Sequence, residues 1–408
     1  MTVPSRSRSR ESPFRFEYDP ATIGLGPGCV DDLAAELEHL GRERALVVCG
    51  STVGSTPAVI DPVTAGLGDR LAGVFDETTP EKRLETALDG RDRLEDADAD
   101  ALVSLGGGSS LDVAKAINAL AASERTREEA AAEFAETGTL AVPDDPVPIV
   151  AVPTTLAGAD LSQVAGLAAS PESGLVDETV GGGLSDPELM PAAAYYDPEL
   201  LATTPESVLT GSAMNGFDKG LETIYAANAT PITDATAARG LAALESSLRA
   251  YGRGERDLET YERLLEGIVL VQYGISRPGE TTLSIVHAFG HGLTRGYEVQ
   301  QGVAHAVVVP HVLEYLFERD GVDARVDVLA DALGVEDAGR TGDAVVETVT
   351  EVRDALDLPS RLRDVDGPEP DAFEGVAEAI LGDGFMANAP PSLEPSVAEI
   401  EGVLEAAW

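Results

Sequence analysis

The chain has 408 residues, long enough for two domains, and its 43 % hydrophobic content is typical of a folded protein. It carries 72 acidic residues against 28 basic ones, a net charge of −44 that excludes nucleic acid as a partner. Because the acidic residues are dispersed along the whole chain, we interpret them as an adaptation to a halophilic cytoplasm; a docking surface for a basic partner is the alternative. No long apolar run or signal core is present, so we expect a cytoplasmic protein without membrane contact.

Up to about residue 205, short apolar runs alternate with helical patterns. Helices are predicted at Val30–Leu40 and Lys82–Leu94, and two of the apolar runs end at Gly106 and Pro153. This alternation is typical of a parallel sheet with right-handed helical crossovers. The predicted strands are Ala45–Val48, Gly73–Phe75, Ala101–Leu105 and Val147–Val152.

After Pro205 the apolar residues take helical spacing throughout. The sequence therefore predicts a frayed N-terminal tail (1–13), an α/β domain (14–205) and an all-α domain (206–408). The helices expected in the last of these are Met214–Tyr225, Thr233–Tyr251, Leu258–Tyr273, Leu283–Leu293, Ala304–Leu316, Val345–Leu356 and Val397–Trp408.

Two polar loops follow predicted strands of the α/β domain. Gly106, Gly107 and Gly108 let the backbone approach a ligand, and the helix that follows points its N–H groups and positive dipole end at it. We interpret this loop as a pyrophosphate site; a tight turn is the alternative. The second loop, Pro153–Ser162, should lie in the same crevice, because open parallel sheets bind ligands beyond the carboxyl ends of their strands; an ordinary capped loop is its alternative.

Four of the five histidines fall within 25 residues: His287, His291, His305 and His311. The spacing of His287 and His291 places both rings on one face of a helix, which suits a metal pair or a proton relay. Satisfied core residues are the alternative for each histidine taken alone.

The segment upstream of the histidines offers few further metal ligands. Asn215 and Lys219 share one helical face, but a neutral amide and an ammonium do not hold a divalent cation. Asp218 and Glu222 could do so, but they lie on neighbouring faces, and we expect them to point elsewhere. Lysine is rare here, with three among 28 basic residues, so Lys219 should have a specific role; a surface lysine is the alternative.

Three segments resemble motifs of the iron-containing (group III) alcohol dehydrogenases. Gly106–Lys115 resembles their GGGSxxDxAK segment, Pro153–Ser162 their PTT-(A/L)-G segment and Gln301–His311 their HGVANAILLPH segment. The resemblance runs from about Phe16 to the C-terminus. It implies a Rossmann-like N-terminal domain, a helical C-terminal domain and a substrate site between them.

The ligand positions of the metal-using members fall on Asn215, Lys219, His287 and Gln301, and only His287 is retained. The resemblance therefore implies no catalytic iron or zinc. The chain is most similar to the maleylacetate reductases, which work without a metal and also carry asparagine at the position of Asn215. Their PTTxAGSE motif and their C-terminal end resemble residues 153–160 and 388–408. They carry histidine at the position of Lys219, which leaves the substrate open.

The activity implied is hydride transfer between NAD or NADP and a carbonyl or conjugated keto acid. We expect Lys219 to stabilise the developing alkoxide in place of a metal, with His287 or His291 as its partner. NADP should be tolerated, because Gly50 stands where relatives carry an aspartate that binds the ribose. The expected catalytic residues are Lys219, His287, His291 and Asn215. We expect Asp160 and His305 to contact the substrate. The expected cofactor-binding residues are Gly50, Ser51, Gly106, Gly107, Gly108, Ser109, Asp112, Lys115, Thr154, Thr155 and Ser162.

A homodimer is the expected assembly. Three alternatives stay open at this point: a metal-dependent alcohol dehydrogenase, a lyase of the dehydroquinate synthase type that uses the nicotinamide transiently, and a silent protein that keeps the cofactor fold.

Overall fold

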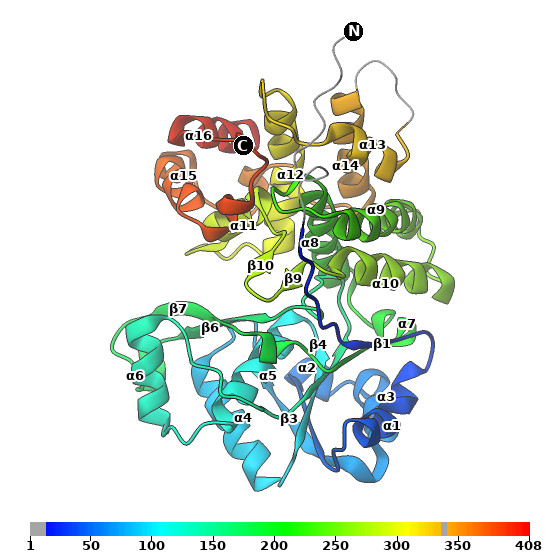
Figure 1. Ribbon diagram of the computed structural model, residues 1–408, viewed down its shortest axis with the longest axis vertical. Coiled ribbons are helices and arrows are strands. Elements are labelled where there is room, and N and C mark those ends of the chain that lie inside the picture. Colours follow the sequence, from blue (N-terminus) through cyan, green and yellow to red (C-terminus); the bar gives the residue numbers. More distant parts are fainter. Residues whose placement is uncertain (1–13, 336–340) are drawn as a thin grey trace. The chain divides into compact units, whose positions relative to one another are not determined.

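A computed structural model describes residues 14–335 and 341–408, and in it the chain divides into two compact units (Figure 1). One comprises Tyr18–Thr155 and Ala159–Thr204. The other comprises Pro205–Trp408, the short segment Leu156–Gly158 and the residues that end at Glu17. The tail predicted at 1–13 lies outside the described residues. Within the described ranges, no helix is long and apolar enough to cross a membrane.

The first unit is built on a six-stranded parallel sheet with the order β1-β8-β5-β4-β2-β3. Its central strands are buried on both faces and read as continuous apolar runs, as strands covered by helices on both sides do. The strands are β1 (Thr22–Leu25), β2 (Ala45–Gly50), β3 (Leu71–Thr78), β4 (Ala101–Gly106), β5 (Ile149–Pro153) and β8 (Ala193–Tyr196), with a separate antiparallel hairpin of β6 (Val164–Ala169) and β7 (Val180–Ser185).

Helices connect these strands, as the alternating pattern predicts. The helix after the glycine loop, α5, is buried along most of its length and contacts β4, β2 and β6. The helices of this unit are α1 (Leu33–His39), α2 (Ser51–Gly54), α3 (Pro57–Leu67), α4 (Leu84–Asp96), α5 (Gly108–Ala121), α6 (Arg127–Thr137) and α7 (Pro198–Leu201).

The second unit is helical, apart from the two-residue strands β9 (Ser276–Arg277) and β10 (Glu280–Thr281). Its central helix is α8, which is buried on nearly every side and contacts α9, α10, α11 and α12 (Figure 1). The helices are α8 (Glu206–Tyr225), α9 (Pro231–Gly252), α10 (Leu258–Gln272), α11 (Ile285–Thr294), α12 (Gln301–Phe317), α13 (Val326–Leu333), α14 (Thr341–Ala355), α15 (Phe373–Leu381) and α16 (Val397–Ala406).

Glycines let the backbone of α8 approach its neighbours closely. A Cβ atom on Gly302 of α12 would lie 1.9 Å from the carbonyl oxygen of Gly211, and one on Gly216 would lie 2.2 Å from the carbonyl oxygen of Leu156. Both distances are far below van der Waals contact, so any larger residue would force the backbones apart. The turn of α8 that carries Lys219 is therefore held close to α12 and to the segment Leu156–Gly158.

Candidate active site

The two loops predicted to bind the cofactor lie together at the ends of β4 and β5. The N–H of Thr154 donates to the carbonyl oxygen of Gly106 at 2.9 Å, and a Cβ atom on Gly107 would lie 3.1 Å from Cγ2 of Thr155. Gly106 has φ +131°, a conformation that favours glycine. The α5 helix starts at Gly108 with N–H groups that have no partner within the helix. The assignment of these loops as a pyrophosphate site stays a prediction.

Lys115 and Asp112 hold the shape of this region. Lys115 is fully buried, and its ammonium donates to the carbonyl oxygens of Ser162 at 2.7 Å and Val164 at 3.0 Å. Asp112 forms an ion pair with Lys82 at 2.6 Å. Both side chains therefore fasten neighbouring segments to α5, and through those segments they would position the cofactor loop.

Gly50 and Ser51 lie where β2 passes into α2. A Cβ atom on Gly50 would lie 3.1 Å from the carbonyl oxygen of Thr78, so this position tolerates a side chain only if the neighbour shifts. One carboxylate lies close to α2: a Cβ atom on Gly54 would lie 2.6 Å from Cβ of Asp76 on β3. Asp76 is exposed, and sequence reasoning did not consider it.

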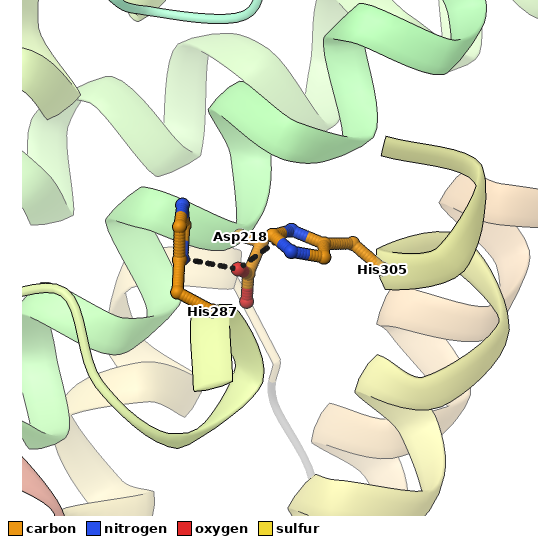
Figure 2. Close-up of side chains that lie close together, drawn as sticks. All are labelled: Asp218, His287 and His305. Atoms are coloured by element: carbon orange, nitrogen blue, oxygen red, sulfur yellow. Dashed lines mark ion pairs between the residues drawn. The ribbon is translucent and has the colours of Figure 1, made fainter. Parts of the chain in front are cut away.

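The helical unit contains a cluster of four buried titratable side chains. Figure 2 shows Asp218 of α8 between His287 of α11 and His305 of α12. Oδ2 of Asp218 lies 3.3 Å from Nδ1 of His287 and 3.2 Å from Nδ1 of His305. Glu222, one turn further along α8, lies 2.5 Å from Nδ1 of His287 and also accepts the N–H of that residue at 3.0 Å.

The expectation that Asp218 and Glu222 point away from the histidines is therefore wrong. The two carboxyls do lie on neighbouring faces of α8, but α8 is enclosed by other helices, so both faces meet α11 or α12. A helix with one buried stripe would have sent one of them to solvent.

The interior of the unit favours the neutral form of each group in the cluster. Burial raises the pKa of Asp218 to about 7 and that of Glu222 to about 8. Burial lowers the pKa of His287 and of His305 to about 3. The cluster is therefore largely neutral and holds little net negative charge below pH 7.

His305 occupies space that a glycine provides. A Cβ atom on Gly290 of α11 would lie 2.2 Å from Nε2 of His305, and the rings of His287 and His305 meet edge to face with centroids 4.6 Å apart. His305 is fully buried within the described chain. Its assignment as a substrate contact stays a prediction, as does that of Asp160 in the other unit, which is 5 % exposed.

Lys219 and Asn215 lie on the same face of α8, as their spacing predicts. The ammonium of Lys219 donates to the carbonyl oxygen of Gly158. Its charge lowers the pKa of Asp218 and of Glu222, which places the ammonium within electrostatic reach of the cluster. Oδ1 of Asn215 is buried and has no hydrogen-bond partner among the described residues.

The four clustered histidines have three different environments. His287 and His305 meet in the buried cluster. His291 is partly exposed, and its Nδ1 lies 2.8 Å from Oδ2 of Asp383. His311 lies 3.6 Å from Glu314 on its own helix, and burial lowers its pKa. The structure therefore brings two of the four rings together and gives the third a carboxylate that sequence reasoning missed.

The residues at the usual ligand positions do not fit iron. Asn215, Lys219 and Gln301 supply two neutral amides and an ammonium, which bind a divalent cation poorly or repel it. Within the described ranges, the group of possible ligands is Asp218, His287 and His305, whose candidate atoms lie within 4.8 Å of one another. In that group Nδ1 of His287 already contacts Glu222 at 2.5 Å, whereas the carboxyl oxygens of Asp218 and the ring nitrogens of His305 are buried without a hydrogen-bond partner among the described residues.

Comparisons with known proteins identify the family. Residues 20–198 match the model of the iron-containing alcohol dehydrogenases, and residues 210–408 match the C-terminal model of the same family. A maleylacetate reductase of Burkholderia cepacia is 28 % identical over 80 % of this chain and 82 % of its own. An NAD-dependent methanol dehydrogenase of Bacillus methanolicus is 30 % identical over 74 % of this chain and 75 % of its own.

Solved structures agree with these matches. A maleylacetate reductase from Agrobacterium tumefaciens superposes with a TM-score of 0.77 at 25 % identity, covering 97 % of this chain and 98 % of its own. A 1,3-propanediol oxidoreductase has the same fold, with a TM-score of 0.85 at 23 % identity over 97 % of this chain and all of its own. The chain belongs to the iron-containing alcohol dehydrogenase family. Within that family it is an NAD(P)-dependent oxidoreductase that is similar both to maleylacetate reductases and to alcohol dehydrogenases.

Proposed function

We propose that this protein reduces the carbonyl group of a conjugated keto acid similar to maleylacetate, or of a related aldehyde or ketone, with NADH or NADPH and without a catalytic metal. The observation that carries the proposal is the ammonium of Lys219, which stands at a ligand position of the metal-using relatives and beside a cluster of neutral buried groups. The substrate class is taken from the maleylacetate reductases among the relatives.

The bound nicotinamide supplies the hydride that reduces the carbonyl carbon. As the carbonyl oxygen gains negative charge, the ammonium of Lys219 would stabilise it, which is the part that a metal plays elsewhere. The amide of Asn215 lies one turn away on the same face of α8 and can donate a hydrogen bond to the same oxygen. His291 would return the proton, because its imidazole is partly exposed while those of His287 and His305 are buried.

The buried cluster beside Lys219 leaves the positive charge of this ammonium available to act on the substrate. If Asp218 and Glu222 were both ionised, they would neutralise the charge that the mechanism requires. Their raised pKa values keep them largely protonated below pH 7, so two carboxylate charges do not offset the charge of the ammonium. Buried carboxyls beside the lysine are thus compatible with its electrostatic role.

The experiment is a turnover assay on the protein after dialysis against a chelator, at molar salt. Oxidation of NADH and of NADPH is followed by absorbance with maleylacetate and with a panel of keto acids, aldehydes and ketones. The proposal expects net oxidation of the cofactor in proportion to substrate reduced. Product without net oxidation would indicate a lyase, and no turnover with the whole panel would favour a silent cofactor-binding protein.

A further inference from the structure

A carboxylate outside the buried cluster is fixed against the partly exposed histidine of α11. Oδ2 of Asp383 lies 2.8 Å from Nδ1 of His291, while Oδ1 of Asp383 accepts the N–H of Phe385 at 2.9 Å. Asp383 is thereby the N-cap of η8, a 3₁₀-helix of residues Gly384–Asn388. One carboxyl group thus uses its two oxygens for two different tasks.

The segment that carries Asp383 is fastened to α11 at its other end too. The side chain of Asn388 donates to the carbonyl oxygen of Leu283 at 2.8 Å, and its own carbonyl oxygen accepts the hydroxyl of Ser284 at 3.0 Å. Between these ends, the ring of Phe385 lies 5.1 Å from that of His291. The position of the carboxylate relative to the imidazole is therefore set by contacts at both ends of η8.

The ionisation of Asp383 decides which nitrogen of His291 carries the proton. Burial acts to raise the pKa of this carboxyl, but the hydrogen bonds with His291 and with the N–H of Phe385 outweigh burial and lower the pKa. An ionised carboxylate is a pure acceptor, so Nδ1 of His291 must be the donor. Nε2 of the neutral ring is then left with the lone pair. The side chain of His291 is 41 % exposed against 10 % for that of Asp383.

We propose that Asp383 is a positioning residue that fixes the proton of His291 on Nδ1, so that Nε2 exchanges the proton of the reacting alcohol. This inference rests on the proposed function. In alcohol oxidation the O–H proton passes to Nε2, the carbon gives its hydride to the oxidised nicotinamide, and a carbonyl forms. Reduction is the reverse: the imidazolium returns the Nε2 proton to the alkoxide and becomes neutral with Nδ1 still bonded to Asp383.

Other charged or titratable groups also act on this pair. Arg295, which follows α11, lowers the pKa of Asp383, and His305 on α12 is coupled to His291 electrostatically. Both remain in place in the variants below. A change in pH dependence can therefore be assigned to the substituted carboxyl.

The test is Asp383→Asn, because the amide oxygen can still cap η8 while the NH₂ group turns toward His291. The ring would then accept at Nδ1 and carry its proton on Nε2, where it cannot serve as a base. We expect kcat to fall by about 100-fold or more with KM within about threefold, and the pH dependence of kcat to change. Asp383→Glu, which keeps the carboxylate, should restore part of the rate.

The matched control is Asp186→Asn. Asp186 caps the 3₁₀-helix Pro187–Leu189 by the same bond, accepting the N–H of Glu188 at 2.9 Å, and it is partly exposed. If capping alone matters, both variants should lose the same stability and neither should lose kcat. A loss of kcat confined to Asp383→Asn supports the inference; unchanged kcat in a folded Asp383→Asn overturns it.

A second readout does not depend on turnover. In protein labelled with ¹⁵N at its five histidines, long-range correlation spectra report which ring nitrogen carries the proton. The signal lost in His291→Gln is that of His291. It should show the Nδ1–H form in the natural protein and the Nε2–H form in Asp383→Asn. An Nε2–H form in the natural protein would refute the positioning role whatever the substrate, whereas absence of turnover with an Nδ1–H ring would count against the proposed function alone.

Discussion

Replacing Lys219 by methionine removes the charge on which the proposed metal-free catalysis depends. Methionine keeps nearly the length and apolar volume of lysine. An ammonium about 4 Å from an alkoxide is worth roughly 4 kcal/mol at the effective dielectric constant of about 20 that describes protein sites. Loss of one oxyanion donor costs a similar amount, about 3–4 kcal/mol, or about 10²–10³ in kcat. We therefore expect kcat of Lys219→Met to fall by that factor, with smaller changes in KM.

The variant should fold, because the surrounding groups can adjust their protonation. Lys219 lowers the pKa of Asp218 and of Glu222, so without it these carboxyls stay protonated more firmly and leave no unpaired buried charge. Loss of the hydrogen bond to Gly158 should cost about 1 kcal/mol of stability. Circular dichroism and thermal unfolding check this point before rates are compared.

The assay measures kcat and KM for NADPH oxidation across pH, with Lys219→Arg alongside. Arginine should not restore the rate, since its planar guanidinium does not fit a site built for a compact ammonium. A folded Lys219→Met with near-normal kcat would show that the lysine is structural. The histidines of α11 would then have to stabilise the alkoxide. In that case His291→Ala should lower kcat as much as the loss of a general acid does.

Three further predictions concern the metal, the cofactor and pH. Elemental analysis of active protein should show well under one iron or zinc per chain, and chelators should leave the activity unchanged. A stoichiometric metal that is lost together with activity would contradict this prediction. If Asp218→Asn then lacked that metal, the metal site would be the buried cluster. NADP should be used at least as well as NAD, because a glycine occupies position 50; a preference for NAD of about a hundredfold or more would refute this and would point to Asp76. Burial raises the pKa of Asp218 to about 7 from its ordinary value of 3.8, so between these pH values the stability of the folded state should fall as pH rises, by about 1.4 kcal/mol per pH unit. Urea unfolding measures this effect at pH 4.5 and at pH 6.5. Between these two pH values the free energy of unfolding of the natural protein should fall by about 2–3 kcal/mol more than that of Asp218→Asn. Equal decreases in the two proteins would contradict the raised pKa.

The strands and helices that follow strong periodic patterns could be predicted from the sequence. The runs that became β2, β4 and β5 are apolar because both faces of the sheet are covered, and α9, α10 and α16 begin and end within two residues of the predicted limits. The edge strand β1 and its neighbour β8 have four residues each, too short for periodicity to show. The hairpin strand β7 contains three consecutive glycines, which carry no strand preference.

Some residues of the candidate site could likewise be predicted from the sequence, and others could not. Asn215 and Lys219 were found because their spacing is local to one helix. Asp383 is separated from His291 by 92 residues and lies in a short segment after α15 with no repeating pattern. Its role becomes visible only when the tertiary fold brings it to α11. The contacts of Asp218 with the histidines could not be predicted, because the sequence does not reveal that α8 is enclosed on several sides.

The segment Leu156–Gly158 has a consequence for dissecting the protein into fragments. A polypeptide beginning at Pro205 would contain every helix of the helical unit but not these three residues. It would lose the backbone that packs against Gly216, the N–H of Leu156 that donates to Ser212 at 3.0 Å, and the acceptor of the Lys219 ammonium. The helical unit is therefore discontinuous in sequence. To fold by itself, it should need a peptide with the residues Leu156–Gly158, either added separately or joined to the start of α8.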